Sequence, residues 1–402
     1  MDHYVVVGAG QAGASLVAKL RSEGFEGHIT LIGSEPVPPY QRPPLSKAYL
    51  LGDMAEERLY LRPEAFYEDQ NIDLITGADV TAIDPAAKTL TVAGKSLAYD
   101  QLALTTGSSA RRLPGSIGGD LGGVFTVRTL ADVDAMAPHF AQGKRALIVG
   151  GGYIGLEAAA VARKLGVEVT VIEMADRILQ RVAAPQTSDY FRALHREHGV
   201  KIMENTGLSR LVGDTVVTGA ELADGRKLDV DFVIVGVGIA PNTELADTAG
   251  LTTDNGIVVD AFGRTSDPSI WAAGDCAAFQ LRGGLRRLES VQNAIDQAEV
   301  VARNMMGSDI AYEPKPWFWS DQYDVKLQIA GLNVGYTDVV ERRGEDGSVS
   351  FWYYGEGRLL AVDAMNDPRN YMIGKRLIEA GKSPAPEVIA DPATDMKALL
   401  KS

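Results

Sequence analysis

The first hydrophobic pattern along the chain is a short β-branched run, Tyr4-Val5-Val6-Val7, which is followed by closely spaced glycines. An apolar run of this length that ends in turn residues predicts a buried strand. The residues from Ala14 to Arg21 are compatible with a helix, and the run from His28 to Ile32 predicts a second strand. The order of strand, turn, helix and strand is typical of an α/β fold.

The glycines between the first strand and the helix are spaced as GxGxxG, from Gly8 to Gly13. In this motif the first glycine permits a tight turn, the second lets a pyrophosphate approach the backbone, and the third allows close helix packing. The phosphate then rests on the helix N-terminus. Glu35 follows Gly13 by 22 residues, near the distance at which an acid meets ribose hydroxyls. The predicted dinucleotide contacts are Gly8, Gly10, Gln11, Ala12 and Gly13.

The same pattern recurs in the middle of the chain. A predicted strand from Arg145 to Val149 enters the turn Gly150–Gly155, and a helix is expected from Leu156 to Leu165. The next predicted strand, Val167 to Ile172, ends in Glu173, 18 residues past Gly155. A carboxylate there accepts hydrogen bonds from a 2′-hydroxyl and repels a 2′-phosphate, and no arginine follows immediately. NADH is therefore favoured over NADPH.

One GxGxxG match is a weak signal, because glycine turns between strands and helices are common. Two matches, each with a strand, a helix and an acid in place, predict two dinucleotide-binding folds. Two such folds in one chain suggest FAD together with a pyridine nucleotide, with the flavin carrying the hydride chemistry.

Composition narrows the class of protein further. The chain has 402 residues, of which 46% are hydrophobic and 23% charged, which is enough for two or three domains. The net charge of −14 argues against nucleic acid as the main ligand. The start, MDHYVVVGAG, carries an acid where a signal peptide needs positive charge, and the apolar runs are shorter than the roughly 20 residues of a membrane span. We therefore expect a cytoplasmic protein with no membrane segment.

A third motif, PYQRPPLSK from Pro39 to Lys47, makes a family resemblance explicit. Read with the two glycine turns, the sequence resembles the NADH-dependent ferredoxin reductases of bacterial cytochrome P450 and ring-hydroxylating dioxygenase systems. The resemblance covers essentially the whole chain. It continues through Thr105-Thr106-Gly107, Val235–Asn242, Ala273-Gly274-Asp275, Leu288–Ala294 and Pro316–Gln322.

The resemblance implies a glutathione-reductase-like α/β architecture, with two Rossmann-type dinucleotide-binding domains and a C-terminal α+β domain. The FAD domain is split around the inserted NAD domain. We place the first part of the FAD domain at residues 1–112, the NAD domain at 113–242, the second part of the FAD domain at 243–312 and the C-terminal domain at 313–402.

The resemblance also implies contacts with FAD. Lys47 would lie beside the isoalloxazine ring, where a cation stabilises the reduced form, although composition alone favours a solvated loop lysine. Trp319 would cover one edge of the ring, while Trp317 is expected in the core. In this family an acidic residue holds the adenosine ribose. The matching position in this sequence is Ser34, so either the Ser34 hydroxyl or the neighbouring Glu35 takes that role. Further implied contacts are Arg42, Val80, Thr106, Gly107, Arg128, Gly274, Asp275, Ser290 and Val291.

The implied NADH contacts lie mainly in the second glycine turn. Glu173 would hold the adenosine ribose, and Gly238 would approach the nucleotide through its backbone. The carboxylate that matches Glu157 faces the nicotinamide in this family and pairs with the lysine that matches Lys47. A first-turn glutamate stabilised by the helix dipole is the structural alternative. Glu289, expected to open a helix that runs to Met306, is a second candidate near the carboxamide. The turn residues are Gly150, Gly152, Tyr153, Ile154 and Gly155.

The chemistry that follows is hydride transfer from NADH to FAD and single-electron transfer to a [2Fe-2S] ferredoxin, with Lys47 and Glu157 as the catalytic residues. Disulfide reductases need two nearby cysteines, whereas this chain has one, Cys276, which we expect to be a small buried hydrophobe. His195 and His198 are interpreted as surface or helix residues, and no metal site is expected.

The ferredoxins of this family are acidic, so docking on an acidic chain requires a local basic surface. Arg282, Arg286 and Arg287 form a cluster without an acid, although such a loop is often simply solvated. We expect a monomer. The alternatives are a rubredoxin reductase, or an NADH-sensing flavoprotein of the apoptosis-inducing-factor type.

Overall fold

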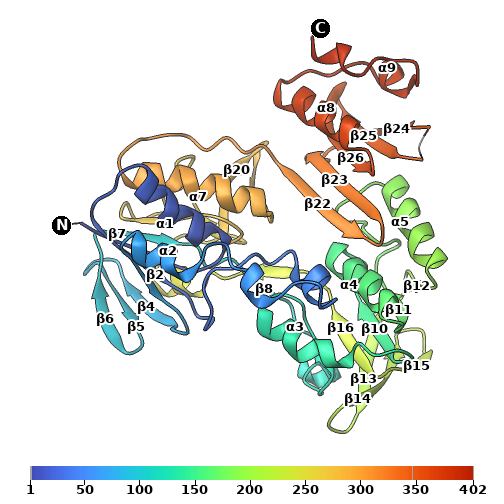
Figure 1. Ribbon diagram of the computed structural model, residues 1–402, viewed down its shortest axis with the longest axis horizontal. Helices are drawn as coiled ribbons and strands as arrows, with labels where there is room; N and C mark the ends of the chain where they lie inside the picture. The colour runs from blue at the N-terminus through green and yellow to red at the C-terminus, as the bar shows by residue number, and fades with distance from the viewer. Residues whose placement is uncertain (1, 346, 402) are drawn as a thin grey trace. The chain divides into compact units, whose positions relative to one another are not determined.

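The computed structural model describes residues 2–345 and 347–401. The chain forms two compact units, each assembled from several segments (Figure 1). Unit 1 contains the residues up to Gln41 together with Ala55–Ser109 and Ile239–Pro316. Unit 2 contains Arg42–Met54, Ala110–Gly238 and the residues from Trp317 onward.

Unit 1 is built on a five-stranded parallel sheet with strand order β19-β7-β1-β2-β3. Helices α1 and α7 pack against each other on one face, and their apolar sides share a core with Val6 and Leu31 (Figure 1). On the other face, Val5 and Ile32 share a core with Leu90 of a three-stranded antiparallel sheet, β4-β5-β6. Both faces of the central strands are thus covered, which explains their continuous hydrophobic runs.

The bounds of these elements in unit 1 are β1 (His3–Val7), α1 (Gln11–Ser22), β2 (His28–Ile32), α2 (Glu64–Asp69), β3 (Ile72–Ile75), β4 (Val80–Asp84), β5 (Thr89–Val92), β6 (Lys95–Ala98), β7 (Gln101–Leu104), β17 (Ile239–Pro241), α6 (Glu244–Thr248), β18 (Ile257–Val258), β19 (Ile270–Ala272), β20 (Ala277–Leu281), β21 (Gly284–Arg286) and α7 (Val291–Met305). The chain boundary between the units falls within β8 (Ser108–Ala110).

Unit 2 repeats the same plan with a parallel sheet of order β12-β11-β10-β16-β9 and a three-stranded antiparallel sheet, β13-β14-β15. These elements are β9 (Val124–Phe125), α3 (Leu130–Met136), β10 (Arg145–Val149), α4 (Tyr153–Lys164), β11 (Glu168–Ile172), α5 (Pro185–Glu197), β12 (Lys201–Met203), β13 (Leu208–Gly213), β14 (Val217–Leu222), β15 (Lys227–Asp229) and β16 (Phe232–Val235). A short helical segment with a kink at Lys47, Leu45–Tyr49, packs against α4.

The last part of unit 2 is a five-stranded antiparallel sheet, β22-β23-β26-β25-β24, on which α8 packs through Leu377 and Ile373. Its elements are β22 (Trp317–Gln322), β23 (Val325–Gly331), β24 (Asp338–Arg343), β25 (Val349–Gly355), β26 (Arg358–Met365), α8 (Pro368–Glu379) and α9 (Pro386–Ala390). The predicted α/β class, with two dinucleotide-binding folds and a C-terminal α+β part, is confirmed.

Two predicted helix ends differ from the structure. Helix α4 begins at Tyr153 and not at Leu156, because Gly152 is the extended N-cap residue and the helical backbone starts at the next residue. Helix α7 begins at Val291 and not at Glu289, because the Ser290 hydroxyl accepts a hydrogen bond from the Asn293 amide and caps the helix. Within the described residues, no helix is both long and apolar enough to span a bilayer.

Candidate functional site

The first glycine turn is held by close backbone packing at two of its three glycines. A Cβ on Gly8, where φ is +113°, would lie 2.2 Å from the Thr105 carbonyl oxygen. A Cβ on Gly13 would lie 2.1 Å from the carbonyl oxygen of Gly8. Gly10, in contrast, has no atom within 4 Å of an added Cβ. The first and third positions thus require glycine for packing, and the second faces open space.

The second turn has the same geometry. A Cβ on Gly150, where φ is +108°, would lie 2.3 Å from the Gly236 carbonyl oxygen, and one on Gly155 would lie 2.4 Å from the carbonyl oxygen of Gly150. Gly152 is open, with no atom within 4 Å. Gly238, at φ +99°, is likewise open. Gly152 and Gly238, the two open glycines, are positions at which the sequence predicts close approach of a nucleotide to the backbone.

The helices that follow the two turns leave their first amides available. Gly10 caps α1 and Gly152 caps α4, and neither helix start has a side-chain cap. Amides at a helix N-terminus, beside a backbone without side chains, bind diphosphate oxygens. Both turns therefore fit the pyrophosphate of a dinucleotide.

The acids after the second strand of each unit are in different environments. Glu35 accepts a hydrogen bond from the Tyr40 hydroxyl at 2.6 Å, while Ser34 is exposed. In unit 2 the Glu173 carboxylate accepts from the amides of Gly151 at 2.7 Å and Ala175 at 2.8 Å. The Glu173 carboxylate is thus fixed at the edge of the second glycine turn. The ribose roles of Ser34, Glu35 and Glu173 stay predictions.

Several predicted flavin contacts of unit 1 lie near the first turn. A Cβ on Gly274 would meet the Ala12 side chain at 3.0 Å, so the Gly274 segment passes directly beside α1. The Asp275 carboxylate accepts from the Ser108 hydroxyl at 2.8 Å, and Thr106 donates to the Asn242 carbonyl at 2.7 Å. The structure also places Gly107 after β7, Val80 at the start of β4, Ser290 at the N-cap of α7 and Val291 at its first position. Glu289, the second predicted nicotinamide contact, directly precedes this cap.

The remaining predicted flavin contacts belong to unit 2. The Arg42 guanidinium donates to the Arg128 carbonyl at 2.8 Å, which joins these two positions. Trp319 lies on β22, and the Lys47 ammonium is 5.9 Å from the centre of a Trp319 ring. Trp317, which we expected in the core, is only partly buried.

The predicted pair of Lys47 and Glu157 is a salt bridge in the structure. The Lys47 ammonium lies 3.1 Å from Glu157 Oε1, and their side chains are 18% and 7% exposed. Glu157 lies on α4, directly after the second glycine turn, so the pair is adjacent to the predicted nicotinamide region. Lys47 also lies 3.6 Å from the exposed carboxylate of Asp321.

Two serines that sequence reasoning missed complete the surroundings of Glu157. Ser46 donates to Glu157 Oε2 at 2.9 Å, and Ser320 donates to Oε1 at 2.7 Å. Burial raises the pKa of Glu157 above its ordinary value, while Lys47 and the two serines act in the opposite direction. Desolvation thus favours the protonated carboxyl group, and three polar contacts favour the ionised one.

Ser320 is itself bonded to Gln322, and Gln322 to His195. His195 lies in helix α5 as the sequence indicated, but it is fully buried and not a surface residue. Its ring is covered because α5 turns that face toward Gln322 and Tyr323 at the end of β22. The signal that could have identified Ser320 and Gln322 is their i,i+2 spacing, which places both side chains on one face of a strand.

Cys276 is completely buried, and burial raises the pKa of its thiol. Its Sγ contacts the carbonyl oxygens of Leu104 and Ala273, each at 3.4 Å. A buried thiol with a raised pKa is a poor nucleophile.

The predicted arginine cluster lies at the hairpin of β20 and β21: Arg282 follows β20, Arg286 ends β21 and Arg287 comes directly after it. Arg287 forms a salt bridge with Glu289 at 2.8 Å and donates to the Asp275 carbonyl at 2.7 Å, so an acid from outside the cluster contacts it. Arg286 is partly buried, and Arg282 is exposed.

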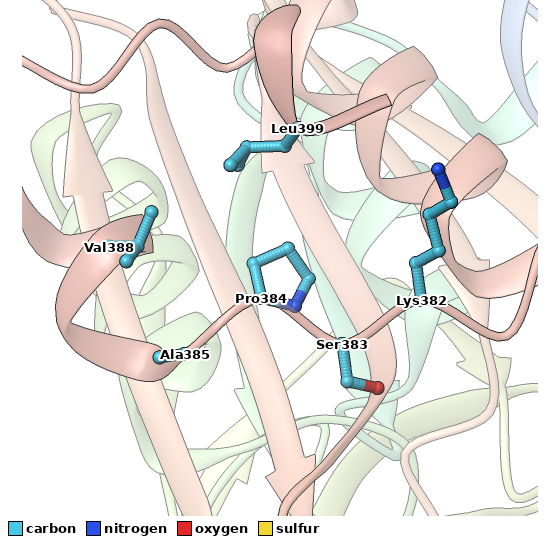
Figure 2. Close-up of a pocket in the computed structure, with 6 residues that line it drawn as sticks. All are labelled: Lys382, Ser383, Pro384, Ala385, Val388 and Leu399. Carbon is cyan, nitrogen blue, oxygen red and sulfur yellow. The ribbon is translucent and has the colours of Figure 1, made fainter. Parts of the chain in front are cut away.

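A separate surface cavity of about 310 Å³ lies in the C-terminal part of unit 2 (Figure 2). Figure 2 shows Pro384, Val388 and Leu399 in its lining, beside Lys382, whose ammonium donates to the Leu400 carbonyl at 2.9 Å. This cavity therefore has little of the chemistry of a reaction site. In the part of the chain that the structure describes, no group of acids, histidines or cysteines is arranged to hold a metal ion.

Two parallel sheets, each with a glycine turn open for a diphosphate, define an α/β protein that binds two dinucleotides. The chain matches the family model described as pyridine nucleotide-disulphide oxidoreductase over residues 2–298, and the model described as reductase C-terminal over residues 317–400. It therefore belongs to the pyridine nucleotide-disulphide oxidoreductase family, and it is an oxidoreductase. The prediction of FAD and a pyridine nucleotide as cofactors is confirmed by this membership.

Similar proteins agree with this assignment. The chain is 47% identical to a ferredoxin–NAD(P)+ reductase of Sphingomonas sp., covering 94% of this chain and 93% of that protein. It is 43% identical to rhodocoxin reductase of Rhodococcus erythropolis, covering 98% and 93%. The solved complex of putidaredoxin reductase with putidaredoxin contains a chain that is 40% identical, with a TM-score of 0.96, covering 100% of this chain and 98% of that one. The predicted resemblance to ferredoxin reductases is confirmed.

Proposed function

We propose that this protein is an NADH-dependent ferredoxin reductase, which passes electrons singly to a [2Fe-2S] ferredoxin of a cytochrome P450 or ring-hydroxylating oxygenase. The names of its relatives support a small iron-sulfur acceptor. The observation that carries the proposal is the single, fully buried cysteine. A dithiol relay needs a second cysteine, so electrons must leave through the flavin itself.

In this proposal FAD, when bound, supplies the chemistry of accepting a hydride and releasing single electrons. The turn at Gly8–Gly13 holds its diphosphate, and Asp275 binds the ribityl hydroxyls. Lys47 places a positive charge beside the ring, where it offsets the negative charge that reduction brings. Glu157 holds the Lys47 ammonium in place and faces the nicotinamide. The remaining predicted flavin contacts are assigned to FAD in the same way.

The pyridine nucleotide binds at the second turn, and we propose NADH over NADPH because of Glu173. Its carboxylate, held by the amides of Gly151 and Ala175, accepts hydrogen bonds from a 2′-hydroxyl and repels a 2′-phosphate. The expected result is a kcat/KM for NADH well above that for NADPH. In Glu173→Gln the preference should shrink, mainly through a lower KM for NADPH.

The decisive test of the function is a reductase assay with purified holoenzyme. NADH oxidation is followed with several [2Fe-2S] ferredoxins and one rubredoxin as acceptors, and flavin reduction is recorded separately by absorbance. Fast flavin reduction with fast reduction of at least one ferredoxin supports the proposal. Fast flavin reduction with no reduction of any ferredoxin would contradict it.

Rubredoxin is the second candidate acceptor, because the rubredoxin–NAD+ reductase of Pseudomonas putida is 39% identical and the match covers 91% of this chain. The same assay separates the two candidates. A rubredoxin that is reduced with a higher kcat/KM than every ferredoxin would favour this second function. A cytoplasmic location and a monomeric state stay predictions.

The proposed ferredoxin contacts remain Arg282, Arg286 and Arg287. They differ in how accessible their side chains are to an acidic partner. Arg287 is 8% exposed and forms a salt bridge with Glu289, while Arg282 lies at the exposed surface, where an acidic partner can reach it. Arg282→Glu should therefore raise the KM for ferredoxin, and the increase should shrink at high salt. Arg58→Glu, an equal charge change at another exposed position of unit 1, is the matched control. Equal effects of the two variants would remove the cluster from the interface.

A further inference from the structure

A continuous row of hydrogen bonds runs from Glu157 into the interior of unit 2. Ser320 donates to Glu157 at 2.7 Å, and Gln322 Nε2 lies 3.1 Å from the Ser320 hydroxyl. The Gln322 amide oxygen lies 2.7 Å from His195 Nε2, and the Tyr323 hydroxyl lies 3.2 Å from His195 Nδ1. Ser320, Gln322 and His195 are each 0% exposed.

The chemistry of these groups gives the row one direction. Burial lowers the pKa of His195 to about 4, so its ring is neutral near pH 7 and has one N–H. An amide oxygen only accepts, so His195 Nε2 carries the proton and Nδ1 accepts from Tyr323. Gln322 then donates to Ser320, whose hydroxyl proton points at Glu157. Every donor in the row therefore faces the carboxylate.

Hydrogen bonds aligned in one direction polarise one another in a low-dielectric interior. The Ser320 hydroxyl is consequently a stronger donor to Glu157 than an isolated serine. We propose that Ser320, Gln322 and His195 form a positioning relay that keeps the Glu157 carboxylate ionised and oriented for its contact with Lys47. This inference rests on the proposed roles of Lys47 and Glu157 at the flavin and nicotinamide.

The other charges around Glu157 are consistent with this role. Lys47, from the Leu45–Tyr49 segment, is the cation in direct contact, and it favours the ionised carboxylate. Asp321, next to Ser320 on β22, contacts Lys47 on its exposed side and competes for the same ammonium. Tyr153, on α4 with Glu157, has a fully buried hydroxyl whose pKa is raised well above its ordinary value, mainly by burial, so it stays neutral. The relay adds a favourable contact that solvent cannot screen.

The relay can be tested with Ser320→Ala, which removes the hydroxyl through which the relay donates to Glu157. Losing one hydrogen bond to a buried carboxylate should lower the ratio of ionised to protonated Glu157 at a given pH roughly ten-fold. In the oxidised holoenzyme, ionisation of Glu157 near the flavin should change the flavin absorbance with pH. The pH midpoint of this change should be higher in Ser320→Ala than in the unaltered protein. Gln322→Met should move it in the same direction, and Ser320→Thr, which keeps the hydroxyl, should restore it. Ser350→Ala is the matched control, because Ser350 is equally buried in the same sheet but bonds Trp352.

Glu157→Gln separates the possible failures. If Glu157→Gln removes the pH-dependent absorbance change while Ser320→Ala matches Ser350→Ala, the relay is wrong and the proposed role of Glu157 stands. If Glu157→Gln leaves both the absorbance titration and the hydride-transfer rate unchanged, the proposed role of Glu157 fails and the relay has no function.

A measurement on the unaltered protein covers the case in which these variants do not fold. Nitrogen NMR of labelled histidine in the holoenzyme, with His195→Gln used to assign the signal, should show a neutral His195 ring protonated at Nε2 near pH 6. A ring protonated at Nδ1, or a charged ring at that pH, would reverse the donor direction and overturn the relay.

Discussion

The two glycine-turn units share a backbone geometry but bury different kinds of polar side chain. In both, the first and third glycines pack against carbonyl oxygens and the second is open. Among the described residues, the buried polar side chains of unit 1 are Ser, Thr, Asn and Gln, whereas those of unit 2 include Glu157, His195 and Asp363. The common turn specifies where a diphosphate can bind. In the part of the chain that the structure describes, buried carboxyl and imidazole side chains are thus found in unit 2 and not in unit 1.

The strongest way to break this comparison is to fill the open glycines one at a time. Gly10 and Gly152 have extended backbone that valine can adopt, and added side chains meet no protein atoms at their Cβ. Gly10→Val should fold but lose FAD, and Gly152→Val should keep FAD but bind NADH weakly. A steric conflict with the diphosphate should lower each affinity by about ten- to a hundred-fold or more.

Flavin content after gel filtration and NADH titration of the purified holoenzyme measure the two affinities. Thermal unfolding checks that both variants fold. Loss of both ligands in each variant, or of FAD only in Gly152→Val, would contradict the assignment of one dinucleotide to each turn.

The next largest effect is expected at the Lys47–Glu157 pair. Lys47→Met leaves a buried carboxylate without its cation and should destabilise the protein by about 3 kcal/mol. Glu157→Gln removes the charge but keeps groups that can bond Ser46 and Ser320, so it should cost only about 1 kcal/mol. Denaturant unfolding of the holoenzymes gives both values, and the double variant gives their coupling. Equal costs for the two single variants would mean that the pair is not buried as described.

Asp363 and His195, both buried in unit 2, should make the free energy of unfolding depend on pH in opposite directions. Burial raises the pKa of Asp363 to about 6, so its stabilising contribution is full below about pH 4 and is lost as the pH rises through 6. Burial lowers the pKa of His195 to about 4, so its contribution is full above about pH 6.5 and is lost as the pH falls toward 4. Each is worth about 3 kcal/mol across its range.

Between pH 7 and pH 4.5, Asp363→Asn should therefore lose stability more steeply than the unaltered protein, whereas His195→Gln should lose less or gain. The free energy of unfolding, measured by denaturant titration at several pH values, compares the two slopes. Parallel slopes for all three proteins would show that these groups do not titrate as their burial requires.

Local patterns predicted the fold and the turns well, because a glycine turn between a strand and a helix is encoded within a few adjacent residues. Gly8 and Gly150 could be recognised without any knowledge of the residues that they touch. The surroundings of Glu157 could not, because they join distant segments: Ser320 is 163 positions away in the sequence. His195 reads as a polar helix residue in LHREHG, and only the packing of α5 against the end of β22 buries it. The salt bridge of Arg287 with Glu289 is local and could have been expected.

The smallest expected effect tests the central claim, that electrons leave without a dithiol. The measurement is anaerobic stopped-flow of Cys276→Ala holoenzyme, mixed with NADH and then with oxidised [2Fe-2S] ferredoxin, with flavin and iron-sulfur absorbance recorded. The thiol is buried and its pKa is raised by burial, so both rates should stay within about two-fold of the unaltered protein, as for a mild core substitution. Normal flavin reduction followed by loss of ferredoxin reduction would contradict the account.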